Sequence, residues 1–252
     1  MSGHSKWAGI KHKKAIVDAK RGQAFTRISR EVTISAKEGG ADATSNFRLR
    51  LAVQKAREAN MPADKIQSAI DRGTGAGKGD NIEELRYEGY GPAGVAILVD
   101  AFTDNRNRTS ASLRHIFNKY GGNMAESGAV GWMFERKGVI DANPGEVDPD
   151  EIGLAAIEAG AEDIKVESGS IEITTGPNQF EAVRTAVEAL KGVTIETGEV
   201  TMQPKQSVAV EEDKAAAVLR ILEALEEDDD VQQVYANFDI AADVLERISA
   251  QV

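Results

Sequence analysis

The chain has 252 residues, of which 41% are hydrophobic and 28% are charged, and its formal net charge is -11. This composition is that of an ordinary globular protein and argues against extensive disorder. The absence of cysteine excludes disulfides, thiolate metal sites and thiol catalysis. It also fits a reducing compartment, and the sequence contains neither an apolar run of membrane-spanning length nor a secretory signal, so we expect a cytoplasmic protein that does not contact membranes.

The charges are segregated along the chain. Residues 1–80 carry 16 basic and 8 acidic side chains, residues 81–140 carry 7 of each, and residues 141–252 carry 7 basic and 26 acidic ones. Such segregation could serve only to make the two ends attract each other. The clustering of positive charge within the first third favours the other interpretation, in which that part meets a polyanion.

Three helices are predicted in the first eighty residues. Apolar residues at spacings of three and four mark one helix over residues 24–37 and another over 46–60. Pro62 fits the first turn of a third helix, and Gly73 fits the position just beyond its end. A glycine-rich linker follows, and its spacing does not match a phosphate-binding loop. Residues 1–80 are therefore predicted to form a helical domain.

Strands and helices alternate after the linker. We expect strands at 94–102 and 130–134 on either side of a helix at 107–120. Residues 138–202 show the order strand-helix-strand-strand-helix-strand, which is the ferredoxin-like pattern. A short strand at 207–210, a helix and a strand at 231–238 would complete the earlier strand-helix-strand unit.

The predicted fold class is therefore α+β multidomain. An N-terminal three-helix domain is followed by two α+β domains of the ferredoxin-like βαβ kind, one inserted in the other. The predicted domains are residues 1–80, residues 81–137 plus 203–252, and the inserted residues 138–202.

The N-terminal segment is the strongest candidate site. Between Gly3 and Arg30 it holds eight Lys or Arg residues against one acid, with Trp7 among them. Basic side chains beside an aromatic ring suit backbone phosphates and one stacking contact, whereas the apolar face is too thin for a membrane-surface helix. No apolar stripe organises its first part, so we expect a partner to order it. The predicted nucleic-acid-binding residues are Lys6, Trp7, Lys11, His12, Lys13, Lys14, Lys20, Arg21, Arg27, Arg30, Arg48 and Arg50.

Two further motifs leave alternatives open. Arg106 and Arg108 stand at the start of a predicted helix, where free N–H groups and guanidinium groups would suit a bound phosphate. They could equally pair with Asp100 or Asp104. In the stretch "YEGYGP", Tyr87 and Tyr90 could stack on unpaired bases or belong to a rigid turn before the next strand.

No catalytic residue, metal site or cofactor is predicted. The histidines His4, His12 and His115 lack a partner motif, and no nucleophile elbow or paired acid and base is present. The acidic run Glu226–Asp230 lacks the spacing of a calcium loop, so we expect a solvated turn after a helix. The chain is therefore expected not to be an enzyme.

Several stretches closely resemble the YebC/PmpR family over essentially the whole length. They are "GHSKWAGIKHKKAIVDAKRG", "NMPADKIQSAIDRG", "YEGYGPAGVA", "TDNRNRT" and the pair Gly121–Gly122. The resemblance implies a helical N-terminal domain and two α+β domains, one inserted in the other. It also implies a cytoplasmic, non-enzymatic role in gene expression, because the family is described as transcriptional regulators with a related mitochondrial branch of translational activators.

The expected function is therefore that of a DNA-binding regulator of transcription. The alternative is a translation factor or activator that binds RNA or the ribosome, through ribosomal RNA. Lysine contacts to phosphate do not distinguish the two sugars, so the residues leave this choice open. They leave the oligomeric state open as well.

Overall fold

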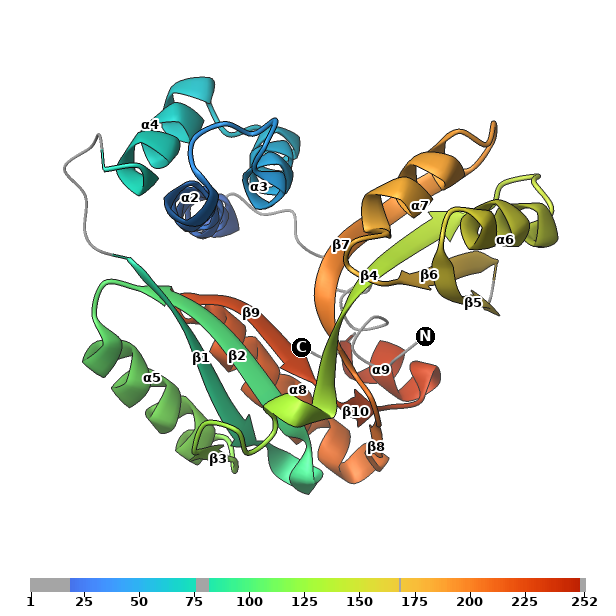
Figure 1. The fold of residues 1–252 in the computed structure, drawn as a ribbon. Coiled ribbons are helices and arrows are strands. Elements are labelled where there is room, and N and C mark those ends of the chain that lie inside the picture. Colours follow the sequence, from blue (N-terminus) through green and yellow to red (C-terminus); the bar gives the residue numbers. More distant parts are fainter. Residues whose placement is uncertain (1–18, 76–81, 168, 250–252) are drawn as a thin grey trace. The chain divides into compact units, whose positions relative to one another are not determined.

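The computed structural model describes residues 19–75, 82–167 and 169–249 (Figure 1). These residues fall into two compact units. Trp132–Ser207 form one unit, and the described residues before and after them form the other. None of the described helices is long and apolar enough to cross a membrane.

The helical domain consists of α2 (Ala19–Gly39), α3 (Phe47–Glu58) and α4 (Ala63–Gly73), so the three predicted helices are confirmed. Their apolar stripes meet in one core that includes Val32, Leu49 and Ala69. The Asn46 side chain caps α3 by accepting a hydrogen bond from the Leu49 N–H at 3.0 Å, and it donates to the Ser35 and Gly40 carbonyls. This one side chain therefore fixes the connection between α2 and α3.

Gly73 has a role that the sequence did not predict. It is the last residue of α4 and not the residue beyond it, and the left-handed conformation belongs to Gly75, with φ at 79°. A Cβ atom on Gly73 would lie 2.2 Å from the Thr33 carbonyl oxygen of α2. The prediction of Gly73 as the residue after the helix was wrong, because its missing side chain serves the close approach of α2 and α4.

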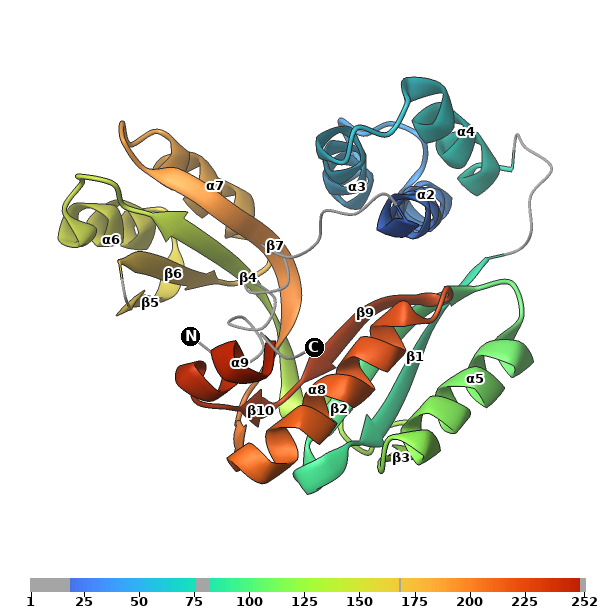
Figure 2. The same cartoon turned by 180° about the vertical axis from the view of Figure 1, so that it is seen from behind.

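The α+β part of the same unit is built on a four-stranded antiparallel sheet, in the order β3-β1-β2-β9. Its strands are β1 (Glu83–Tyr90), β2 (Ala96–Thr103), β3 (Asn123–Ala125) and β9 (Val231–Ala236). The helices α5 (Arg106–Lys119) and α8 (Glu212–Glu227) cover one face and share a core with alternate residues of β2 (Figure 2).

Shorter elements complete this unit. The strands β8 (Val208–Ala209) and β10 (Phe238–Asp239) form a separate parallel pair, and α9 (Ala242–Ser249) follows. A 3-10 turn, η1 (Pro92–Gly94), joins β1 to β2.

The predicted strand at 130–134 was wrong. Residues Gly131–Met133 form a 3-10 turn, η2, and Phe134 begins the next strand. The N–H groups of Val130 and Gly131 donate to the Glu88 carboxylate at 2.6 and 2.7 Å, so they are not available to a sheet. The sheet instead uses β1, for which no strand was predicted.

The second unit has the predicted order of elements. It runs β4 (Phe134–Asn143), α6 (Pro149–Glu158), β5 (Ala161–Glu167), β6 (Ser170–Thr175), α7 (Phe180–Glu188) and β7 (Thr194–Pro204). Its antiparallel sheet has the order β5-β6-β4-β7, which is the ferredoxin-like arrangement. The predicted domain boundaries at 138 and 202 fall inside β4 and β7, whereas the compact unit begins at Trp132 and ends at Ser207.

Candidate nucleic-acid interface

Half of the predicted nucleic-acid-binding residues lie outside the described part of the chain. These are Lys6, Trp7, Lys11, His12, Lys13 and Lys14. The prediction that a partner orders this segment also concerns residues outside the described part of the chain. Lys20 and Arg21 fall within the first turn of α2.

Arg27 and Arg30, on consecutive turns of α2, bind the acidic turn that follows α8. The Arg27 guanidinium donates to the backbone carbonyls of Glu226 and Asp228. Arg30 donates to the Asp229 carbonyl and forms an ion pair with Asp230 at 3.3 Å. Burial lowers the pKa of Arg27. In this arrangement both cations are engaged inside the protein.

Arg48 and Arg50 of α3 differ in whether other groups of the protein already pair with their guanidinium groups. Arg48 forms ion pairs with Glu38 at 2.6 Å and with Glu84 at 2.9 Å, and its guanidinium lies 6.0 Å from the centre of the Phe102 ring. Although burial opposes it, the two carboxylates raise the pKa of Arg48. Arg50 is exposed and lies over the ring of Phe47, with no carboxylate partner among the described residues. Arg50 is therefore the more available of the two.

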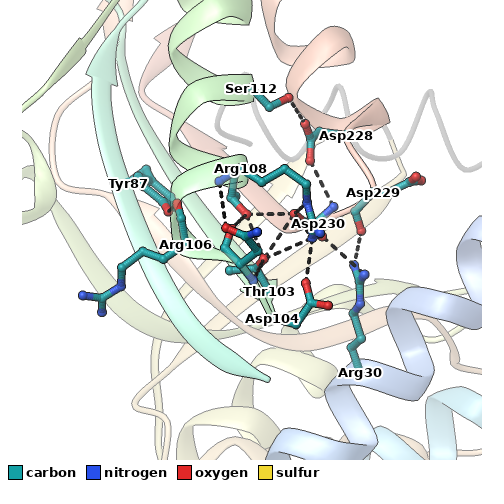
Figure 3. A network of polar contacts seen from close by, with 12 residues as sticks. Arg30, Tyr87, Thr103, Asp104, Arg106, Arg108, Ser112, Asp228, Asp229 and Asp230 are labelled. Atoms are coloured by element: carbon teal, nitrogen blue, oxygen red, sulfur yellow. Dashed lines mark hydrogen bonds and ion pairs between the residues drawn. The ribbon is translucent and has the colours of Figure 1, made fainter. Parts of the chain in front are cut away.

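Asp230 is the centre of a polar network that joins four elements (Figure 3). Its carboxylate, 6% exposed, pairs with Arg108 at 2.9 Å and with Arg30, and it accepts hydrogen bonds from Thr103 at 3.2 Å and Thr109 at 2.8 Å. Burial acts to raise the pKa of Asp230, but hydrogen bonds from Arg108 and Thr109 and the charges of Arg108 and Arg30 hold it below its usual value. The prediction of a solvated turn over 226–230 was therefore wrong at Asp230.

The structure gives Arg106 and Arg108, at the start of α5, different surroundings. Arg108 pairs with Asp104 at 2.8 Å, which is one of the alternatives from the sequence, and with Asp230. Arg106 is 68% exposed, and its one carboxylate partner among the described residues is Glu83, at 3.6 Å. The Asn105 side chain already accepts the Arg108 N–H at the helix start. Asp100 pairs with Arg86 instead, at 2.7 Å. Only Arg106 therefore remains open to an anion.

The "YEGYGP" stretch serves the turn before η2. Glu88, 6% exposed, accepts hydrogen bonds from the N–H groups of Gly128, Val130 and Gly131. Burial acts to raise its pKa, but these three donors lower it. The Tyr87 and Tyr90 hydroxyls donate to the Arg106 and Ala129 carbonyls at 3.4 and 3.3 Å. Both rings are half-buried and belong to the scaffold in this arrangement.

The helical domain also presents cations that the sequence did not single out. Arg57 and Lys65 are exposed and make no ion pair within the described residues. Lys65, Ser68 and Arg72 follow one another at spacings of three and four on α4 and line an open groove with α2. That spacing is visible in the sequence, but it lies beside the apolar stripe of the predicted helix, which gives it no distinct signal. Among the described residues, no group of three or more His, Cys, Asp or Glu side chains could hold a metal ion.

These parts define a multidomain α+β protein in which a cation-rich helical domain precedes two α+β parts. Family models identify it further. The model for the TACO1/YebC protein N-terminal domain matches residues 5–76, and the model for the TACO1/YebC second and third domain matches residues 82–238. The chain belongs to the TACO1/YebC family.

Individual relatives agree with this assignment. A protein of Natranaerobius thermophilus named "Probable transcriptional regulatory protein" is 56% identical over 249 residues, which cover 98% of this chain and 99% of the relative. A protein of Magnetococcus marinus with the same descriptive name is 51% identical, over 99% of this chain and all of the relative. The crystal structure of a conserved hypothetical protein from Aquifex aeolicus is similar with a TM-score of 0.79 and 45% identity, and it covers 90% of this chain and 93% of its own.

Proposed function

We propose that this chain is a non-enzymatic regulator of gene expression that binds DNA through its helical domain and the basic segment before it. The observation that carries the proposal is the segregation of charge: residues 1–80 hold 16 of the 30 basic side chains of an otherwise acidic protein. A polyanion would be attracted to this end and repelled by the other. The names of the relatives, which call them probable transcriptional regulatory proteins, support the same role.

The pattern of ion pairs narrows the contact residues. Arg27, Arg30 and Arg48 already have acidic or carbonyl partners in the protein, so a phosphate would have to compete for them. Arg50 and Arg57 have no such partner among the described residues. We therefore assign the main phosphate contacts to the lysines before α2, supported by the exposed arginines of α3.

A salt titration tests this proposal. Binding of a fluorescent DNA duplex is measured by anisotropy at several salt concentrations. If about five phosphates are neutralised, the logarithm of the binding constant should fall with the logarithm of salt with a slope of about -4 to -5. Charge reversal of Lys11, Lys13 and Lys14 to Glu should make the slope shallower by about one unit for each lost contact.

The control reverses three lysines elsewhere. Lys191, Lys205 and Lys214 are exposed, and changing them to Glu alters the net charge of the protein by the same amount. Their reversal should leave the slope unchanged. Equal effects of the two triple variants would contradict a localised interface.

A parallel experiment with RNA distinguishes a role in transcription from a role in translation. The same titration with RNA of matching sequence, together with crosslinking in cells and sequencing of the recovered nucleic acid, gives the natural target. Recovery of promoter DNA supports the regulator of transcription. Recovery of ribosomal or messenger RNA would move the role to translation.

A further inference from the structure

The groove between α2 and α4 has the side chains of an anion site. It has a volume of about 680 Å³ and is lined from α2 by Phe25, Thr26, Ser29 and Arg30, and from α4 and its approach by Met61, Lys65, Ser68 and Arg72; Ile82 and Asp104 complete the lining. Basic and hydroxyl side chains thus occur together over a partly apolar floor. This is the set of groups that contacts phosphate and sugar in nucleic-acid complexes.

Two of the cations retain free hydrogen-bonding capacity. The Lys65 ammonium group makes no ion pair or hydrogen bond within the described residues, so it keeps three donors. Arg72 donates to Ser29 Oγ at 2.6 Å and to the Ser68 carbonyl at 3.3 Å, which uses two of the five N–H donors of a guanidinium group. Ser29 accepts in its bond with Arg72, so its own hydroxyl proton is left to donate.

The groove contains little negative charge to compete with an anion. Asp104 is the one carboxylate among the described residues of the lining, and it is paired with Arg108 at 2.8 Å. Arg30, the third cation, is held by Asp230 at 3.3 Å. Lys65 and Arg72 therefore supply the available positive charge from α4, and Ser29 contributes its hydroxyl from α2.

We propose that the α2–α4 groove binds the phosphodiester backbone of a nucleic-acid strand through Lys65, Arg72 and the Ser29 hydroxyl. This inference rests on the proposed function and adds to it a contact surface distinct from the N-terminal lysines. Lys65 and Arg72 lie seven residues apart on one helix, which corresponds to about 10 Å along its axis. That span exceeds the size of one phosphate, so the groove suits a continuous backbone better than a free ion.

The test removes the two charges of the groove. In the full-length protein, Lys65→Gln combined with Arg72→Gln should weaken binding of the DNA duplex and make the salt slope shallower by about two units. The matched control, Lys214→Gln with Arg220→Gln, removes the same two charges from α8, where neither residue has an ion-pair partner among the described residues. It should leave both quantities unchanged.

A second variant fills the groove without changing charge. Ser68 is exposed, so Ser68→Tyr should be tolerated by the fold, which circular dichroism and a thermal melt would verify. It should weaken DNA binding severalfold through steric exclusion. Normal DNA binding by both the double variant and Ser68→Tyr would overturn the groove as a contact surface.

Control ligands identify the occupant. Inorganic phosphate and a mononucleotide, titrated into the wild-type protein up to millimolar concentration, should not displace the duplex. Displacement by inorganic phosphate that disappears in the double variant would overturn the assignment to a nucleic-acid backbone. Absence of duplex binding by the wild-type protein would instead overturn the proposed function itself. If the Lys11, Lys13 and Lys14 variant binds the duplex more weakly and the groove variants bind it normally, this inference is overturned and the proposed function is not.

Discussion

Glu88 stabilises the turn before η2 with a single carboxylate. Three backbone N–H groups, those of Gly128, Val130 and Gly131, donate to its two oxygens. Glu88→Gln keeps the shape but leaves one oxygen, so at least one buried donor loses its partner. We expect a loss of about 1–3 kcal/mol in the free energy of unfolding, measured by urea denaturation. Glu126→Gln, at an exposed position in the same turn, should have no measurable effect, and equal losses would refute this role.

Asp230 gives the stability of the protein a dependence on pH. Its pKa is held below the usual value in the folded state, so the stabilisation it provides is present above the unfolded-state pKa of about 3.9. It is lost as the pH falls through the lower folded-state pKa. Asp230→Asn should therefore reduce the free energy of unfolding by about 2 kcal/mol at neutral pH. The difference from wild type should begin to shrink below about pH 4, where Asp230 of the unfolded chain takes up a proton, and should vanish below the lower folded-state pKa, where the native aspartate is protonated as well.

Denaturation curves of both proteins at several pH values check this prediction. The exposed Asp239→Asn change removes a carboxylate without a partner among the described residues and serves as the control. A constant difference between wild type and Asp230→Asn down to low pH would mean that the charge is not what stabilises the network.

At the scale of single residues, the sequence predicts ion pairs between residues close together in the chain better than ion pairs between distant residues. The pair of Arg108 with Asp104 was among the alternatives because the two residues are four positions apart on the same turn. The partner Asp230 lies 122 positions away, so its burial follows only from the packing of β9 against β2. Periodicity carries no information about such a contact. The internal engagement of Arg27 and Arg30 escaped prediction for the same reason.

Among the helices, the crossing of α2 and α4 depends on a missing side chain. Because a Cβ on Gly73 would lie 2.2 Å from the Thr33 carbonyl, Gly73→Ala should push the helices apart and destabilise the domain by about 1–3 kcal/mol. Gly22→Ala in α2 meets nothing within 4 Å and should stabilise it by up to about 1 kcal/mol, because alanine favours the helix. Thermal melts of the two variants should shift in opposite directions. A shift of the same sign in both would contradict the packing role.

Elements with a clear hydrophobic periodicity were predictable from the sequence. Elements whose polar residues are paired with neighbouring strands were not. The apolar stripes of α2 and α3 are buried in the core of the helical domain, and that of α5 is buried in the core of the α+β part, so their spacing is visible in the sequence. Strand β1, by contrast, carries charged residues whose partners lie on its neighbours, such as Arg86 opposite Asp100. Its polar composition therefore resembled a loop. The apolar run near Val130 resembled a strand, although Glu88 takes its N–H groups.

At the scale of the whole molecule, residues 132–207 should fold as an independent insert. The order of its elements is complete in itself, and its helix faces, with Phe180, Val183 and Val187 buried, cover its own sheet. Its two ends are also adjacent. Phe134 and Pro204 are partners in the β4–β7 ladder, and the Lys205 N–H donates to the Met133 carbonyl at 2.8 Å. A short Gly/Ser bridge from Gly131 to Val208 would therefore close the gap at a small entropic cost.

We expect the shortened protein to keep its fold and its affinity for DNA, because the removed unit contributes none of the cations assigned to the interface. We also expect residues 132–207 expressed alone to melt cooperatively, since a unit with its own core unfolds as one. Circular dichroism melts of both pieces and the DNA titration of the shortened protein measure this. Loss of structure in either piece would show that the two units depend on each other for stability. Loss of DNA affinity in a folded shortened protein would instead place part of the interface on the insert.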